Sequence, residues 1–142
     1  GVDLSPTMVT QASAKGLYDR LTAGSIEPFL ADEIRAGSKY DLVIAADVFV
    51  YVNDLAPIIV TAARVLAPRG LLAFTVETHA GDSAKLLPTL RYAHGETYIR
   101  TVLDKAGLKP VQIAKSSVRK EKGVPVDSLI VVAQLSSAGS DA

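Results

Sequence analysis

Cysteine is absent from the 142 residues, which excludes disulfide bonds, thiolate zinc sites and cysteine nucleophiles. The same absence suits a reducing compartment, and we expect a cytoplasmic protein. No apolar run approaches the roughly 20 residues that a membrane-spanning helix requires, so no membrane partner is expected. The two histidines lack a spaced set of partner ligands, and no metal site is expected.

Net charge is also absent, because 15 lysine and arginine side chains balance 15 aspartate and glutamate side chains. Without a net positive field, nucleic acid is not expected as a partner. Apolar residues, in contrast, are plentiful: 49% of the chain is hydrophobic and 21% is charged, as in globular proteins. We therefore expect one domain over residues 1–135 and a small, polar, disordered tail, "SSAGSDA", at 136–142.

Strand-like and helix-like patterns alternate along the chain. Helical spacing of apolar residues occurs in residues 6–15, 26–36, 54–66 and 95–106. Strand patterns occur in four places: before Asp3, around Leu21, at 42–46 and at 71–77. The apolar run at 42–46, bounded by Asp41 and Asp47, is typical of a central parallel strand covered on both faces. This order predicts an α/β fold with a doubly wound, Rossmann-like, mostly parallel sheet.

Turn signals mark the second half of the chain. Residues 109–121 and 124–135 flank the turn "KGV" and predict a C-terminal antiparallel hairpin at one edge of the sheet. In "APRG", Pro68 would supply a fixed φ and Gly70 a positive φ. Residues 78–94 mix turn formers with few apolar side chains, which predicts a long loop of the kind that is often functional.

The first residues, "GVDLSPTM", place an acid at the end of a strand and before a helix that starts with Ser5 and Pro6. In open α/β sheets that bind nucleosides, an acid at this junction accepts hydrogen bonds from a ribose diol. The alternative is that Asp3 is an ordinary strand-end acid, stabilised by the dipole of the following helix.

Four segments carry a family resemblance: "GVDLSPTM", "YDLVIAADVFVYV", "RVLAPRGLLAFTVE" and the closing hairpin. Together they resemble the class I S-adenosylmethionine-dependent methyltransferases over nearly the whole chain. The segment "RYAHGETYIRTVLDKAGL" is similar to bacterial predicted methyltransferases that often follow tetratricopeptide repeats. The resemblance implies a seven-stranded sheet in which the last strand is antiparallel and lies beside the fifth.

The chain begins at the equivalent of the family's second strand, so the comparison lacks the first strand and the glycine-rich cofactor loop. We therefore expect an N-terminally truncated domain that binds the cofactor weakly or not at all by itself. Because unpaired buried backbone groups cost about 1 to 3 kcal/mol each, the gap left by a missing strand predicts self-association through that gap, or a borrowed strand.

The resemblance assigns the cofactor, S-adenosyl-L-methionine, to residues near the first two strand ends. Asp3 matches the acid that holds both ribose hydroxyls, and Leu4 and Met8 match positions that pack on the adenine. Ser25 stands where the family often has an acid for the adenine amino group, and the backbone of Ile26 could carry that edge instead. For the apolar residues, ordinary core packing remains the alternative.

Candidate catalytic residues follow later strands. Asp47 could hold the cofactor's amino group, position the nucleophile, or cap the next helix. Glu77 and His79 leave the strand at 71–77, while Arg91 and His94 come from the loop beyond it. Because histidine titrates near neutrality, His94, and after it His79, could act as the general base, or Arg91 and His94 could lock the loop.

The function expected is therefore methyl transfer from S-adenosylmethionine to an unidentified small-molecule or protein acceptor. Two alternatives stay open. An acid after the second strand also serves NAD(P)-binding oxidoreductases, although the closing hairpin and "PRG" argue against that class. A non-catalytic Rossmann-like module that serves assembly is the other.

Overall fold

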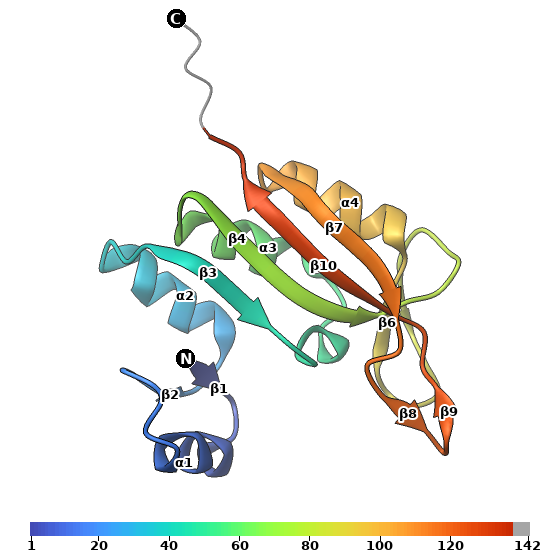
Figure 1. Cartoon of the computed structure of the whole chain (residues 1–142), viewed down its shortest axis with the longest axis horizontal. Coiled ribbons are helices and arrows are strands. Elements are labelled where there is room, and N and C mark those ends of the chain that lie inside the picture. The colour runs from blue at the N-terminus through green and yellow to red at the C-terminus, as the bar shows by residue number, and fades with distance from the viewer. Residues whose placement is uncertain (138–142) are drawn as a thin grey trace, which may run out of the picture. The chain divides into compact units, whose positions relative to one another are not determined.

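In the computed structural model, which describes residues 1–137, strands and helices alternate as far as Glu77, and strands dominate the rest of the chain (Figure 1). The chain divides into two compact units, one formed by residues 1–38 and one beginning at Lys39. Residues 138–142 of the expected tail lie outside the described residues, whereas the Ser136 N–H donates to the Gly107 carbonyl (3.0 Å).

The first unit holds two short parallel strands and two helices. β1 (Val2–Asp3) pairs with β2 (Thr22–Ala23), and these strands are followed by α1 (Pro6–Ala14) and α2 (Ile26–Arg35) respectively. The Ser5 hydroxyl accepts from the Met8 N–H (3.3 Å) and caps α1, as the sequence predicted. Gly16 and Gly37, at φ +63° and +70°, follow the ends of these helices in the left-handed conformation that stops a helix.

A mixed sheet forms the second unit. β3 (Tyr40–Ala45) is parallel to β4 (Leu66–Glu77), and β10 (Ser128–Leu135) lies between β4 and β7 (Leu108–Ser116), antiparallel to both. The last strand is thus inserted beside the family's fifth strand, and the predicted α/β fold with its C-terminal hairpin is confirmed. A small ribbon of β8 (Lys120–Glu121) and β9 (Val124–Pro125) joins β7 to β10.

The core of this unit lies between the sheet and two helices, α3 (Ala56–Arg64) and α4 (Glu96–Lys105), on one face (Figure 1). Alternate residues of the central strands point into it, as the two-residue period of a strand requires. The buried side chains include Leu72, Phe74 and Val76 of β4, Leu129 and Val131 of β10, and Ile59, Ile99 and Leu103 of the helices.

Three expectations about local structure were wrong. A central strand covered on both faces was expected at 42–46, but β3 pairs with β4 alone in the described residues, and one of its faces carries Leu42 and Ile44, which are 48% and 66% exposed. The region 78–94 contains two short antiparallel strands, β5 (Ala84–Leu86) and β6 (Tyr92–His94), because β6 can extend the sheet at Glu77.

The third error concerns the "PRG" segment, which lies inside β4. Arg69 adopts the positive φ, +63°, that was assigned to Gly70. Gly70 is required for a different reason: a Cβ there would lie 2.8 Å from the Ala67 carbonyl oxygen and 3.0 Å from that of Tyr40. The glycine therefore permits a close backbone approach.

Candidate functional site

In the first unit, the predicted nucleoside residues lie together at the carboxyl end of β1. Asp3 is exposed, and its Oδ1 accepts from the Ser5 N–H (2.8 Å), which leaves the second carboxylate oxygen for a ligand. The neighbouring apolar side chains, Leu4 and Met8, are 74% and 51% exposed. Asp3 and Met8 also line a cavity of about 270 Å³.

Ser25 and Ile26 follow β2, the strand parallel to β1, so they belong to the same edge of this small sheet. Ser25 occupies the N-cap position of α2, yet its hydroxyl makes no capping hydrogen bond and is exposed. The hydroxyl therefore remains available to a ligand, and the assignment of Ser25 and Ile26 to the adenine stays a prediction.

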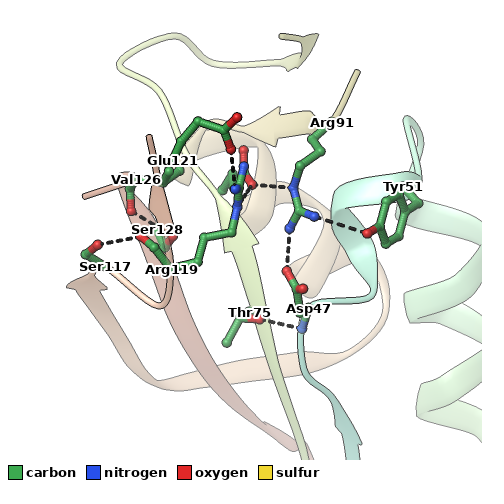
Figure 2. Close-up of polar contacts among 10 residues, drawn as sticks. Asp47, Tyr51, Thr75, Arg91, Ser117, Arg119, Glu121, Val126 and Ser128 are labelled. Atoms are coloured by element: carbon green, nitrogen blue, oxygen red, sulfur yellow. Dashed lines mark hydrogen bonds and ion pairs between the residues drawn. The ribbon is translucent and has the colours of Figure 1, made fainter. Parts of the chain in front are cut away.

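In the second unit, a cluster of charged and aromatic side chains lies at the carboxyl ends of β3 and β4 (Figure 2). We call it the carboxyl-edge cluster, and it consists of Asp47, Tyr51, Glu77, Arg91, Arg119 and Glu121. The parallel pairing of β3 with β4 brings Asp47 and Glu77 to one edge. The arginines come from the 78–94 region and from the segment after β7.

Arg91 is the centre of this cluster. Its Nε donates to Glu77 Oε1 (2.5 Å), its Nη2 forms an ion pair with Asp47 Oδ1, and its Nη1 donates to the Tyr51 hydroxyl (3.1 Å). The guanidinium carbon also lies 5.2 Å from the centroid of the Tyr51 ring. Burial lowers the pKa of Arg91, but the hydrogen bonds to Glu77 and Asp47 outweigh it, and the net pKa is raised.

Glu77 is 1% exposed and serves two arginines through one oxygen, since Arg119 Nε also donates to Oε1 (2.8 Å). Arg119 Nη1 pairs with Glu121 as well (2.5 Å). This pairing lowers the pKa of Glu121, and the hydrogen bonds to Glu121 and Glu77 raise the pKa of Arg119. The buried carboxylate thus ties three segments of the chain together.

Asp47 is held in an uncommon backbone conformation, with φ at +54°. Its N–H donates to the Thr75 hydroxyl of β4 (2.9 Å), and its carboxylate forms an ion pair with Arg91. These two interactions together hold the turn in place. The side chain is 57% exposed, so Asp47 meets both the cluster and the solvent. Its proposed roles toward the cofactor and the nucleophile stay predictions.

His94 is fully buried. Its Nε2 donates to the carbonyls of Val52 (3.0 Å) and Asn53 (3.2 Å), and its Nδ1 is covered without a hydrogen-bond partner. Burial lowers the pKa of His94 more than these two bonds raise it, so the ring is neutral at pH 7. The geometry favours the alternative in which His94 locks the loop, and its role as a base stays a prediction.

His79 is half-buried and organises a tight turn. Its Nδ1 accepts from the Gly81 N–H (3.0 Å), while Nε2 donates to the Ser83 carbonyl (2.8 Å). The ring also lines a cavity of about 420 Å³ next to the start of α4. Because both nitrogens serve the turn, general-base action by His79 requires one of these hydrogen bonds to open.

Sequence reasoning noticed Asp47, Glu77 and Arg91 but missed Arg119 and Glu121. Arg119 carried no signal of its own, because it lies in a polar stretch rich in lysine between two strands. Asp47 was visible from its position after an apolar run, although nothing in the spacing showed that Arg91 pairs with it. In the described residues no group of three or more histidine, cysteine, aspartate or glutamate side chains is placed to hold a metal ion. None of the helices in residues 1–137 is both long and apolar enough to cross a membrane.

The order of strands, the antiparallel last strand and the acid after β1 define the class I S-adenosylmethionine-dependent methyltransferase fold. A family profile described as "Methyltransferase domain" matches residues 1–74, and the chain belongs to this family. A comparison with curated proteins found no match.

Solved structures share the fold. One is a SAM-dependent methyltransferase from Methanosarcina mazei, with 13% identity, a TM-score of 0.70, and coverage of 96% of this chain and 81% of that one. Another is the N-methyltransferase NodS from Bradyrhizobium japonicum WM9 in complex with S-adenosyl-L-homocysteine (20% identity, TM-score 0.67, coverage 94% and 64%). A third is the magnesium protoporphyrin IX methyltransferase from Synechocystis PCC 6803 with bound SAM (23% identity, TM-score 0.66, coverage of 96% of this chain and 58% of that one). The chain thus spans less than two thirds of the latter two proteins.

Proposed function

We propose that this chain supplies the nucleoside site for S-adenosylmethionine, which it binds weakly by itself, and takes part in methyl transfer to an acceptor. The observation that carries the proposal is the exposed carboxylate of Asp3 at the end of a parallel strand, next to the exposed apolar side chains of Leu4 and Met8. A carboxylate accepts two hydrogen bonds at once, which suits a ribose diol, and the apolar neighbours suit the flat face of adenine. The accepting carboxylate, the apolar side chains and the adjoining cavity therefore fit the nucleoside half of the cofactor.

The cofactor, when bound, supplies a methyl group on a sulfonium. With Asp3, Leu4 and Met8 holding its nucleoside half, the cofactor would give up this methyl group to the acceptor's lone pair and leave as S-adenosylhomocysteine. The protein's task is to align the two partners and to accept a proton if the acceptor carries one. Asp47, His79 and His94 are the candidates for that proton, and Asp47 is the most exposed of the three.

Calorimetric titration of the chain with S-adenosylhomocysteine, and in parallel with NADH, tests this proposal. We expect weak binding of the first ligand alone and a further loss of about tenfold or more in affinity for Asp3→Asn, because the carboxylate oxygen that Ser5 leaves free becomes an NH2 group, which cannot accept a hydrogen bond from a ribose hydroxyl. Asparagine retains the acceptor for the Ser5 N–H, so the local turn survives.

Asp19→Asn is the matched control, since Asp19 is an exposed acid of the same unit and should leave the affinity unchanged. Equal affinity in wild type and Asp3→Asn would contradict the proposal, as would preferential binding of NADH. Self-association through an unpaired strand edge is a separate proposal, which analytical ultracentrifugation of the same samples tests.

A further inference from the structure

In the carboxyl-edge cluster, two of the three carboxylates are more exposed than the arginines that they pair with, while the third, Glu77, is buried between the arginines. The side chains of Arg91 and Arg119 are 13% and 23% exposed, whereas those of Asp47 and Glu121 are 57% and 42% exposed. With Glu77 included, three carboxylates face two guanidinium groups. The cluster therefore presents a net negative charge to a ligand.

Both arginines are already occupied by protein groups. All three nitrogens of the Arg91 guanidinium have a partner in Glu77, Asp47 or Tyr51. Arg119 donates from Nε and Nη1, and its remaining nitrogen is covered. An anionic ligand would have to break ion pairs with a buried carboxylate before it could bind here, which is costly.

Asp47 and Tyr51, in contrast, remain largely exposed although both contact Arg91. Only Oδ1 of Asp47 is paired with Arg91, and the Tyr51 side chain is 66% exposed. The same guanidinium contacts the carboxylate and the aromatic ring, so the two groups lie close together (Figure 2). The Thr75 hydrogen bond fixes the Asp47 backbone. A fixed carboxylate beside an aromatic ring is a combination that recognises an ammonium group.

We propose that Asp47 and Tyr51 bind the positively charged amine of the methyl acceptor, and this assignment rests on the methyl transfer proposed above. Asp47 and Glu121 are each paired with an arginine, and Glu121 is the weaker candidate because two lysines, Lys120 and Lys122, flank it in the sequence. The acceptor class is thus an amine, in preference to a carboxylic acid.

The test uses two probes with the same ring and opposite charge, benzylamine and benzoate, titrated into the whole chain and followed by ligand-observed NMR. Benzylamine is expected to bind more tightly than benzoate, and Asp47→Asn and Tyr51→Leu should each weaken it about fivefold or more. Asp104→Asn, which changes an exposed acid on α4, is the matched control and should have no effect. Thermal melting of each variant checks that it folds.

Two further ligands, S-adenosylhomocysteine and 5′-methylthioadenosine, show whether Asp47 binds the amine of the acceptor or the amine of the cofactor. S-adenosylhomocysteine carries an amino-acid group that 5′-methylthioadenosine lacks. If Asp47→Asn weakens only S-adenosylhomocysteine and leaves benzylamine binding unchanged, the cofactor's ammonium occupies the site and the inference is overturned. Equal or tighter binding of benzoate, or no binding of benzylamine, overturns it as well. Wild type that binds benzylamine but not S-adenosylhomocysteine would contradict the cofactor proposal and leave the amine site standing.

Discussion

At the scale of single residues, His94 shows how burial changes the role of a titratable side chain. A neutral imidazole can be buried if its N–H finds a partner, and here the carbonyls of Val52 and Asn53 provide one. A protonated ring would bring a second N–H into a position where Nδ1 has no partner. Folding therefore favours the neutral form.

This preference predicts a pH dependence of stability. The pKa of His94 is lowered in the folded protein relative to about 6.5 in the unfolded chain, so the unfolded state takes up the proton first as the pH falls. The stabilisation is fully present above about pH 6.5 and is lost as the pH falls through the folded-state pKa. We expect urea denaturation to give a lower free energy of unfolding at pH 5.5 than at pH 7.5.

His94→Gln should lose most of this difference, because glutamine does not titrate and can still donate a hydrogen bond to a backbone carbonyl. His79→Gln, in which His94 is intact, should retain it. A dependence that is unchanged in His94→Gln would show that another group is responsible.

At the scale of elements, the turn that precedes α4 depends on the absence of a side chain. Gly95 stands at the N-cap position of α4, and a Cβ on it would lie 1.9 Å from the Gly81 carbonyl oxygen. The obstructing atom belongs to the backbone of the turn that His79 organises, so it cannot rotate away. The packing of β6, α4 and this turn is therefore closely coupled.

Gly95→Ala is expected to lower the free energy of unfolding by about 1–3 kcal/mol, as overpacking of a well-packed site generally does. Chemical denaturation measures this value. Gly24→Ala is the control, because no atom lies within 4 Å of a Cβ built there and the backbone φ is not positive. Similar losses in both variants would mean that the turn adapts freely.

At the scale of the whole molecule, the two units differ in the amount of apolar surface that they bury. In residues 1–38, Leu30 is the buried hydrophobic residue among those described, whereas the rest of the described core belongs to the second unit. β1 and β2 contain two residues each, while β4 and β10 contain 12 and 8. Because stability follows buried apolar area, the first unit should open more readily.

Hydrogen exchange followed by mass spectrometry tests this difference. Amides of β1 and β2 should exchange at least about tenfold faster than those of β4 and β10, since local opening exposes little apolar surface in the first unit. Uniform protection across both units would contradict this account. Saturating S-adenosylhomocysteine should slow exchange in β1 if Asp3 binds it, because a ligand that binds only the folded form stabilises that form.

The sequence by itself determined the local structure and the fold class. Ser5 and Pro6 start a helix, glycines follow the ends of three helices, and alternation of patterns predicts a sheet with helices between its strands; each of these depends on residues close together in the chain. Asp3 and Asp47 could be singled out for the same reason, since each follows a strand.

Only the tertiary structure decided which groups meet. Glu77 binds Arg91 and Arg119, which lie 14 and 42 residues further along the chain. The positive φ lies at Arg69, and Gly70 instead permits the close approach of two backbone carbonyls. The reason is physical: helix caps and periodicity are set by short-range sterics and hydrogen bonds, whereas the partners of a buried charge depend on the path of the whole chain through space.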